Sequence, residues 1–594
     1  MIRIWFARVM LAVLLFTGLG CQQDAAVDDA PVQATAQELE ELTAEFQQRI
    51  EKVADGVWMA IGYGLANSIL IEGDNGLIVI DTMETLQTGA AVAAEFRKLS
   101  DKPLAAIIYT HNHADHVFGA QAFIDVLAHK DTPVEVLAHD KTAELVYRVV
   151  SEFRPIISAR SYRMFGTQLG DGQAGNEGIG LELKIYEDSE FAFVKPTRTF
   201  ESKLDVEIAG EKLTLIHAPG ETDDQLFVWN EERKLLAAGD NLYRAFPNLY
   251  TIRGTPHRSL KRWANSLDLA RSLPVELLVP SHGSAIEGRD LVWQTLTDYR
   301  DAIRYVHDQT VRYMNLGYTP DEAVEVVKLP QHLRESPYLR ELYGKVEWSV
   351  RAVYAGNLGW FDGNPTTLRP QPPGQHALRM QELAGGFDGL TTALSKASQA
   401  GQHQWVLELT DTILRLDSGH KQAREARIAA LTARGNAATN PNERHYYLSS
   451  VLELRDDVRF KPLSTSSDRL LSELPMTTMF DSMSVTLRAE DTLSTNLRVG
   501  LSFTDSGERY TLWVRRGVLE VRQGLIDDLD LHAKVDSLAF KKLLTGQRNA
   551  LVALANDYDF PVGNTAQFAA FLNMFKSLRK TPEPAPFAAI DCCD

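Results

Sequence analysis

The sequence predicts a multidomain protein with an α/β layered domain, a mainly α-helical region and a C-terminal α+β domain. Its 594 residues exceed what one hydrophobic core supports. A content of 44% hydrophobic and 24% charged residues is typical of globular proteins. The hydrophobic period also changes along the chain. Strands alternate with helices up to about residue 286, helical spacing then dominates, and a period of two appears from about residue 476.

The N-terminus has the pattern of an export signal. Arg3 and Arg8 precede the apolar run VMLAVLLFTGLG, which is too short for a membrane-spanning helix. The run ends at GLGC, which resembles a bacterial lipoprotein signal with Cys21 as the lipidated residue; an ordinary cleaved secretory signal is the alternative. Residues 22–35 are small and polar, as a tether would be. We expect an exported bacterial protein that is periplasmic and lipid-anchored to the outer membrane.

Charge and cysteine content exclude further classes of protein. The formal net charge of −18 argues against a binder of nucleic acid or of anionic membranes. Membrane contact is therefore expected only through the N-terminal lipid anchor. The three cysteines are Cys21, Cys592 and Cys593, and they leave no disulfide framework through the body of the chain.

The first part of the chain predicts strands and helices in alternation. Between Val57 and Asp81, three short apolar runs predict hairpin strands, and TLQTGAAVAAEFRKLS then predicts a helix. LAAIIYT predicts a buried strand, followed by a histidine-rich loop, a helix in HVFGAQAFIDVLAH and the strand VEVLAH. FGTQLGDGQAGNEGIGLEL lacks the spacing of nucleotide-binding loops, and we interpret it as a loop on the substrate side. Three later stretches predict strands that end in polar turns: KLTLIHAPGET, KLLAAGDNLY and VELLVPSHG.

The second half predicts a helical region and then a small α+β domain. Residues from about 291 to 355 are predicted to be mostly helical, and Trp405, Leu409, Ile413 and Leu416 have helical spacing in a hairpin that resembles a tetratricopeptide-type unit. Alternating apolar residues around the turn DSGE then predict paired strands. Two stretches near the C-terminus predict helices: SLAFKKLLTG and TAQFAAFLNMFKSL.

The loop THNHADHVFG indicates a metal site. Its H-x-H-x-D-H pattern supplies four candidate ligands: His111, His113, Asp115 and His116. Neutral imidazole and carboxylate are the ligands expected for zinc or a similar divalent ion. Three further polar residues each follow an apolar run, where a layered fold brings loops to one edge: Glu221, Asp240 and His282. Together these residues are enough for two metals.

In this order, the motifs resemble the metallo-β-lactamase fold, an αββα sandwich. Asp81 in IVIDT is similar to its first, structural motif, and Glu221 stands where most members have histidine. The resemblance implies two Zn²⁺ per chain, with Asp115 and Asp240 as catalytic carboxylates. It implies one metal held by His111, His113 and Glu221, and another held by Asp115, His116 and His282, with Asp240 between them.

A glutamate at position 221 resembles the alkylsulfatase (SDS-hydrolase-like) branch of the fold, which has glutamate at this place. Three further stretches agree with that branch: YRMFG with GIGL, NLYTIRG and AVYAGNLGWFDGNP. The branch implies a helical dimerisation domain, and therefore a homodimer, and a sterol-carrier-like C-terminal domain. The expected boundaries are 1–20 for the signal peptide, 21–45 for the tether, 46–297 for the catalytic domain, 298–470 for the dimerisation domain and 471–594 for the C-terminal domain.

The resemblance implies zinc-dependent hydrolysis of an amphiphilic alkyl sulfate, or a similar small molecule, to alcohol and sulfate by an activated water. Asn248 and Arg253 match residues with which the family holds sulfate oxygens, and the planar arginine fork suits such oxyanions. Two residues depart from the branch. Asp240 replaces its usual glutamate, and Trp348 lies near the place of a histidine that is a candidate proton donor. Either another residue protonates the leaving group, with His257 and His332 as weak candidates, or the substrate differs.

Two other hypotheses remain open. The chain could be a metallo-β-lactamase-fold hydrolase of another ester or lactone, or a non-catalytic lipid-binding lipoprotein with a structural metal. The complete ligand set argues against the second hypothesis. The sterol-carrier-like domain either offers an apolar surface to the alkyl chain or serves only for packing.

Overall fold

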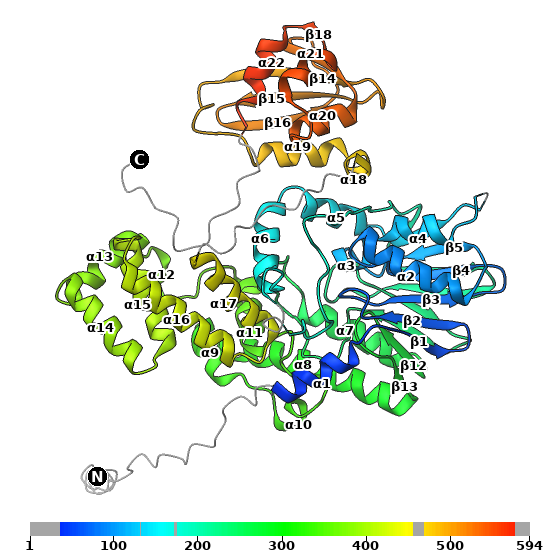
Figure 1. Cartoon of the computed structure of the whole chain (residues 1–594), viewed down its shortest axis with the longest axis horizontal. Coiled ribbons are helices and arrows are strands. Elements are labelled where there is room, and N and C mark those ends of the chain that lie inside the picture. Colours follow the sequence, from blue (N-terminus) through cyan, green and yellow to red (C-terminus); the bar gives the residue numbers. More distant parts are fainter. Residues whose placement is uncertain (1–35, 131, 171–174, 456–467, 576–594) are drawn as a thin grey trace, which may run out of the picture. The chain divides into compact units, whose positions relative to one another are not determined.

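The computed structural model describes residues 36–130, 132–170, 175–455 and 468–575 (Figure 1). The export signal, most of the tether and the predicted lipidation at Cys21 lie outside the described residues, as do Cys592 and Cys593. Within the described ranges, no helix is both long enough and apolar enough to cross a membrane.

Two β-sheets form the centre of the N-terminal domain. The first has the order β1-β2-β3-β4-β5-β6-β7 and the second β13-β12-β11-β10-β9-β8. The strands of the first sheet are β1 (Arg49–Ala54), β2 (Val57–Ile61), β3 (Ser68–Glu72), β4 (Leu77–Ile80), β5 (Leu104–Ile108), β6 (Glu135–His139) and β7 (Arg198–Phe200). Those of the second are β8 (Lys203–Ile208), β9 (Glu211–His217), β10 (Leu226–Asn230), β11 (Leu235–Gly239), β12 (Leu277–Pro280) and β13 (Ile286–Glu287).

Apolar side chains from both sheets form the core between them. Ile78 and Ile108 from the first sheet share one buried cluster with Leu215 and Val228 from the second. Every residue of β4 is buried because helices cover the outer face of the sheet as well. This explains why the sequence of β4 is continuously apolar and does not alternate.

Helices cover the outer faces of both sheets, which completes an αββα sandwich (Figure 1). Phe96 and Phe123, from α2 (Leu86–Leu99) and α4 (Ala120–Leu127), pack in the cluster of the first sheet. Trp263 of α7 (Leu260–Ser272) packs in the cluster of the second sheet. The other helices up to residue 368 are α1 (Ala36–Glu45), α3 (Ala114–Val117), α5 (Thr142–Val150), α6 (Arg154–Met164), α8 (Arg289–Asn315), α9 (Pro320–Val326), α10 (Gln331–Arg334), α11 (Val346–Leu358) and α12 (Pro365–Leu368).

The functional loops follow strands that run in parallel. β4 pairs in parallel with β5, and β11 pairs in parallel with β12, so the loops after these strands lie at the same edge. Asp81 follows β4 with a φ of 61°, in the left-handed region that few non-glycine residues adopt. A Cβ at Gly119 would lie 2.0 Å from the Thr82 carbonyl oxygen, so only glycine lets these two loops approach so closely.

The predicted helical hairpin is present, with one difference in its buried face. α15 (His403–Leu416) buries Leu409 and Ile413, whereas Trp405 is 41% exposed and lies outside the buried stripe. The helices of this region are α13 (Pro373–Leu383), α14 (Phe387–Gln399), α15, α16 (Lys421–Ala437) and α17 (Pro441–Leu454).

The C-terminal region forms the predicted α+β domain around a sheet with the order β16-β15-β14-β17-β18. Val499 of β14 pairs with Leu512 of β15, and both side chains are buried, as their alternation predicts. The elements are α18 (Asp468–Glu473), α19 (Met476–Ser484), β14 (Asn496–Phe503), β15 (Arg509–Arg515), β16 (Val518–Gln523), β17 (Leu531–Val535), α20 (Ser537–Leu544), α21 (Ala550–Asn556), β18 (Asp559–Val562) and α22 (Thr565–Leu572).

Candidate metal centre

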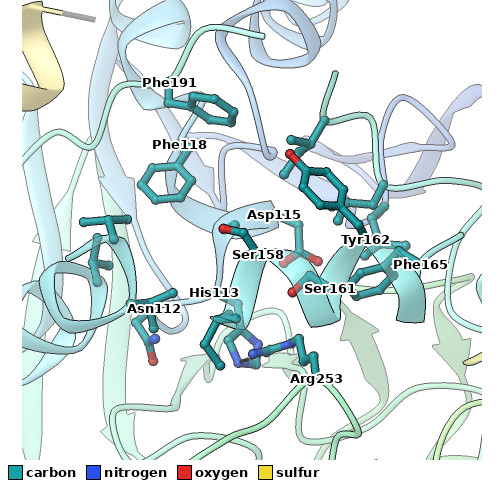
Figure 2. Close-up of a pocket in the computed structure, with 18 of the residues that line it drawn as sticks. Asn112, His113, Asp115, Phe118, Ser158, Ser161, Tyr162, Phe165, Phe191 and Arg253 are labelled. Carbon is teal, nitrogen blue, oxygen red and sulfur yellow. Dashed lines mark hydrogen bonds between the residues drawn. The ribbon is translucent and has the colours of Figure 1, made fainter. Parts of the chain in front are cut away.

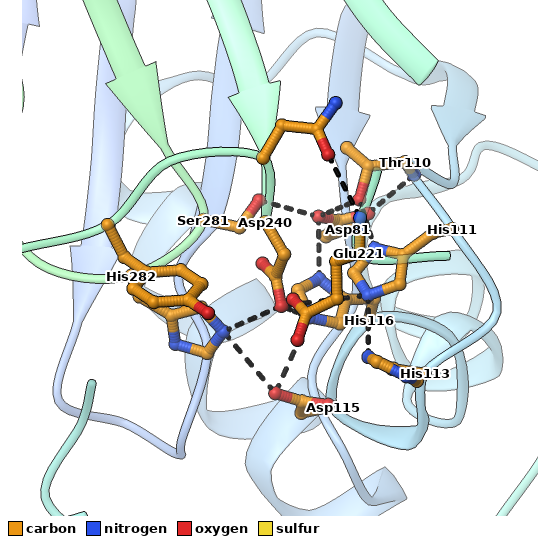
Figure 3. Close-up of polar contacts among 12 residues, drawn as sticks. Asp81, Thr110, His111, His113, Asp115, His116, Glu221, Asp240, Ser281 and His282 are labelled. Carbon is orange, nitrogen blue, oxygen red and sulfur yellow. Dashed lines mark hydrogen bonds and ion pairs between the residues drawn. The ribbon is translucent and has the colours of Figure 1, made fainter. Parts of the chain in front are cut away.

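The segments that follow β5, β9, β11 and β12 bring together all seven predicted metal ligands (Figure 3). The side chains form two groups, and within each group the candidate ligand atoms lie within 4.8 Å of one another. The first group is His111, His113, Glu221 and Asp240, and the second is Asp115, His116 and His282. Imidazole nitrogens and carboxylate oxygens are a donor set that suits a divalent cation.

Asp240 lies between the two groups. Its Oδ2 is 3.6 Å from Nε2 of His111, 3.5 Å from Nε2 of His116 and 3.2 Å from Nε2 of His282. The first of these imidazoles belongs to one group and the other two belong to the second. A carboxylate in this place can contact cations in both groups, and the aspartate reaches them without the additional methylene of a glutamate.

Asp81 fixes the orientation of His116. Its Oδ2 accepts hydrogen bonds from His116 Nδ1 at 2.8 Å, Thr110 Oγ1 at 2.8 Å and Ser281 Oγ at 2.9 Å. In the neutral form of His116, donation through Nδ1 leaves the lone pair on Nε2. That buried Nε2 has no hydrogen-bond partner among the described residues, so it can bind a cation.

A backbone carbonyl orients His282 in the same way. Nδ1 of His282 lies 3.0 Å from the carbonyl oxygen of Leu65, which can only accept a hydrogen bond. In the neutral imidazole, Nε2 of His282 then carries the lone pair and faces Asp240, whose Oδ2 lies 3.2 Å away. The Leu65 backbone is itself held by Glu84, a buried residue whose Oε1 accepts from the Leu65 N–H at 3.3 Å.

Glu221 pairs with Arg258. Nη1 of Arg258 lies 2.5 Å from Oε1 of Glu221 and also donates to the carbonyl oxygen of Asn248. Both side chains are buried. Oε2 of Glu221 has no hydrogen-bond partner in the described part of the chain, so it is the oxygen available to a cation.

Burial and neighbouring charges determine which of these groups hold protons. Burial opposes a charge on His116, but the carboxylates, led by Asp240, raise its pKa well above the usual value. Against the same burial, Asp240 raises the pKa of His282. Burial raises the pKa of Glu221 to about 8, against the pull of Arg258.

Metal binding at pH 7 is therefore expected to release protons. In protein without bound metal, the raised pKa values favour the protonated forms of His116, His282 and Glu221, and a cation must displace those protons. Affinity should fall as the pH is lowered, by about tenfold per pH unit for each proton displaced. Zinc titration by calorimetry, in two buffers of different ionisation enthalpy, counts the protons released. A count of zero at pH 7 would contradict this ligand set.

A mainly apolar cavity of about 180 Å³ opens onto the centre (Figure 2). Figure 2 shows His113 and Arg253 together at one end, with aromatic rings farther along the wall. The labelled rings are Phe118, Phe165, Phe191 and Tyr162, and the aliphatic lining includes Val146, Val149, Val150, Ile157, Ile179 and Leu183. Ile179 and Leu183 belong to the stretch FGTQLGDGQAGNEGIGLEL, which we interpret as a loop on the substrate side. Their place in the cavity wall agrees with that interpretation.

The two residues predicted to hold sulfate lie beside the centre. Nη2 of Arg253 is 3.1 Å from Nε2 of His113, and its Nη1 donates to the Gly254 carbonyl oxygen at 3.2 Å. Arg253 lines the cavity. Asn248 is buried, and neither its Nδ2 nor its Oδ1 has a hydrogen-bond partner among the described residues.

The proton donors considered from the sequence lie elsewhere. His257 and His332 are exposed, and neither is among the described residues that line the cavity. Trp348 is also outside that lining. It is half-buried, with Nζ of Lys345 5.6 Å from its ring centroid.

Comparison with known proteins relates three segments of the chain to known families. Residues 61–282 match the metallo-β-lactamase superfamily, residues 319–457 match alkyl sulfatase dimerisation, and residues 464–581 match alkyl sulfatase C-terminal. A linear primary-alkylsulfatase from Pseudomonas sp. is 37% identical over 519 residues, which cover 85% of this chain and 98% of the relative. The chain belongs to the alkylsulfatase family.

Two further relatives agree with this assignment. An alkyl/aryl-sulfatase from Saccharomyces cerevisiae is 28% identical over 88% of this chain and 82% of its own length. The solved structure of the stereoselective inverting sec-alkylsulfatase Pisa1 from Pseudomonas sp. is 25% identical, covers 91% of this chain and 86% of its own, and has a TM-score of 0.84. The predicted fold is confirmed, and this alkylsulfatase is a sulfuric ester hydrolase.

Three residues at the site of this alkylsulfatase were not predicted. Asn112 lies inside the metal motif, lines the cavity and has a buried Oδ1 with no partner among the described residues. Its place in the motif was the available signal. Arg258 and Tyr343 follow no motif or hydrophobic period, and only the tertiary structure brings them to the centre.

Proposed function

We propose that this alkylsulfatase hydrolyses alkyl sulfate esters to alcohol and sulfate at a centre of two divalent cations, which we expect to be zinc. The observation that carries the proposal is the grouping of seven candidate ligand side chains, with Asp240 between the two groups, at the end of an apolar cavity. The relatives support the substrate class, since linear primary and secondary alkylsulfatases are among them.

The unpaired atoms of the centre fit two cations. His111, His113 and Glu221 would hold one and Asp115, His116 and His282 the other, with Asp240 contacting both. Buried acceptors without a partner among the described residues include Nε2 of His116, Oε2 of Glu221 and Oδ1 of Asp240. Bound cations of this kind lower the pKa of a water, neutralise developing charge and orient the ester.

The contact between Arg253 and His113 supports a role for Arg253 in holding sulfate. Nδ1 of His113 lies 2.9 Å from Nε2 of His111, so these two atoms face the same point. If both bind a cation, the His113 proton must be on Nε2, because a neutral imidazole carries one proton. That nitrogen then offers no lone pair to Arg253. The guanidinium becomes available to a sulfate oxygen, with Asn248 as a second polar contact.

The apolar walls of the cavity support an alkyl group on the ester. Burying a chain of several methylenes contributes about 0.8 kcal/mol for each CH₂. An ester or lactone without a sulfate remains the second candidate function, because the same walls would accept its apolar part. Such a substrate would leave the Arg253 and Asn248 pair without an anionic partner.

A hydrolysis screen tests the proposal. Metal-replete protein is assayed against alkyl sulfates of different length, lactones and phosphate monoesters, with sulfate measured by ion chromatography. We expect sulfate release from alkyl sulfates and little turnover of the other classes. Turnover of lactones alone would establish the second candidate.

We also propose that the protein is a homodimer through its helical region. Residues 319–457 match alkyl sulfatase dimerisation, and large apolar side chains are exposed there, including Leu358 at 60%, Trp360 at 76% and Leu383 at 83%. Light scattering should give twice the chain mass. Replacing Trp360 and Leu383 by glutamate should give monomers, whereas Leu551→Glu, at an 82% exposed position in the C-terminal domain, should not. A monomeric wild type at micromolar concentration would contradict the proposal.

The export signal and the lipid anchor at Cys21 are proposals as well. They rest on the N-terminal sequence, with its basic start, short apolar run and GLGC. Cell fractionation should place the wild-type protein in the outer-membrane fraction, and Cys21→Ser should lose both this location and incorporation of labelled palmitate. A wild type recovered entirely from the soluble periplasm would favour the ordinary secretory signal.

A further inference from the structure

Arg258 is a buried arginine beside the centre to which the proposed function assigns no role. It is only 4% exposed. Its Nη1 carries two hydrogens and has two acceptors, which are Oε1 of Glu221 at 2.5 Å and the carbonyl oxygen of Asn248. A single nitrogen atom therefore joins a candidate metal ligand to a residue that is proposed to hold sulfate.

We propose that Arg258 is a positioning residue that couples the metal ligand Glu221 to the side chain of Asn248. The inference rests on the proposed sulfate contact of Asn248 and adds the residue that keeps this contact in place. Arg258 is not among the described residues that line the cavity, so it acts through Asn248 and not on the ester itself. The inference holds whichever bond of the ester breaks, because the sulfate oxygens need a binding site in either case.

The backbone of Asn248 is held on its other side as well. Its N–H donates to Oη of Tyr243 at 2.7 Å, and Tyr243 is fully buried. The Tyr243 ring meets the His282 ring edge to face, with a centroid separation of 6.2 Å. The carbonyl group of Asn248 is thus tied to a ligand of the first group, and its N–H group to a residue that packs on a ligand of the second.

A glycine restricts the same loop from a third direction. The N–H of Gly344 donates to the Phe246 carbonyl oxygen at 3.0 Å. A Cβ at Gly344 would lie 2.1 Å from the carbonyl oxygen of Pro247 and 2.9 Å from Cα of Asn248, so only glycine permits this approach. The main chain of Asn248 therefore has little freedom, and its side chain starts from a fixed point.

The side chain of Asn248 is available to a ligand. It is 1% exposed, and neither its Nδ2 nor its Oδ1 has a hydrogen-bond partner among the described residues. A buried amide without a partner costs free energy, and a sulfate oxygen that accepts from Nδ2 recovers part of it. Neutralising Glu221 requires only the carboxylate contact of Arg258. The contact of the same nitrogen with the Asn248 carbonyl oxygen is what links the two sites.

The contact with Arg258 also directs the Glu221 carboxylate. Oε1 accepts from Arg258, whereas Oε2 has no partner in the described part of the chain and is left for a cation. With a cation at Oε2, Glu221 is fixed, and Arg258 passes this constraint to Asn248. Coupling of this kind is reciprocal, so sulfate held at Asn248 should in turn raise the affinity for metal.

The test is a double-mutant cycle between Arg258→Lys and Asn248→Ala. A lysine keeps the positive charge beside Glu221 but not the planar fork, so the zinc content at saturating zinc should stay at about two ions per chain. In Arg258→Lys, kcat/KM for octyl sulfate should fall about 10- to 100-fold, and the inhibition constant of inorganic sulfate should rise with it. In the Asn248→Ala background, the same substitution should change both by less than about threefold, because the side chain that Arg258 positions is already absent.

Two further variants complete the design. Arg258→Met removes both contacts and leaves Glu221 buried without its partner, so this variant should lose zinc as well as activity. Arg233→Lys is the matched control, because Arg233 pairs with Glu211 at 2.6 Å from the turn between β10 and β11 and is outside the described lining of the cavity. The control should keep the zinc content, the melting temperature and kcat/KM of the wild type.

Four results would overturn the role of Arg258. An unchanged kcat/KM in Arg258→Lys would exclude it, and an equal loss with and without the Asn248 side chain would show that Arg258 does not act through Asn248. Loss of zinc from Arg258→Lys would reduce its role to support of the metal ligand, and two zinc ions in Arg258→Met would separate it from Glu221. Each of these results leaves the alkyl sulfatase function intact, which instead fails if the wild type releases no sulfate from any ester.

Discussion

Asp240→Asn is expected to abolish most of the activity and to lower the metal content from about two ions per chain to one or fewer. The Oδ2 of Asp240 lies within 3.6 Å of imidazole nitrogens from both groups, so one substitution affects both cations. An asparagine keeps the shape but loses the charge that balances the two cations. Because loss of a group that only orients a ligand already costs about 10- to 100-fold, kcat/KM should fall by about 100-fold or more.

Elemental analysis together with steady-state kinetics checks this expectation. Asp205→Asn is the matched control, because Asp205 is an exposed carboxylate of β8 that pairs with Lys203 on the surface. That variant should retain full metal content and activity. If Asp240→Asn retained two ions and wild-type kcat/KM, Asp240 would not bridge the centre.

Arg253→Ala should reduce kcat/KM for alkyl sulfates about ten- to several-hundredfold and leave the metal content unchanged. The lost contact is charge-assisted, which corresponds to roughly 1.5–3 kcal/mol, and more if it forms mainly in the transition state. Arg253→Lys should recover only part of the loss, because an ammonium group cannot form the bidentate fork. Kinetics with a series of alkyl sulfates measures both effects.

Two comparisons separate sulfate binding from a structural role of Arg253. Arg351→Ala removes a half-buried arginine of α11 that pairs with Asp321 and Glu347 away from the metal centre, and it should not change kcat/KM. An uncharged ester or lactone, if it is turned over at all, should be nearly indifferent to the loss of Arg253. Equal losses with sulfates and uncharged substrates would show that Arg253 only supports His113.

The metal motif could be predicted because its chemistry is local. His111, His113 and Asp115 lie within five positions after a buried strand, and any layered fold directs such a loop to one sheet edge. Glu221 and His282 were predictable for a related reason, since each follows a strand whose apolar sequence is plain. Because β4 pairs in parallel with β5, and β11 with β12, the loops that follow the two strands of each pair lie at the same edge of their sheet.

The rest of the site depends on contacts between distant segments. Arg258 is buried only because Glu221 and the Asn248 carbonyl oxygen pair with it, and an arginine in the stretch PHRSL otherwise resembles a surface residue. Tyr343 reaches the cavity from a loop more than two hundred residues after the first ligand. No periodicity marks such a residue, because its position is set by the packing of α17 and of the Pro247 backbone against its loop.

The most direct test of the central claim is sulfate release from octyl sulfate as zinc is returned to chelated protein. The seven-ligand centre predicts that the rate is negligible without metal, rises with added zinc and reaches its plateau at about two equivalents per chain. His111→Ala should fail to reach that plateau at the same zinc concentration. Full sulfate release by thoroughly chelated protein, or no release at two equivalents of zinc, would contradict the account.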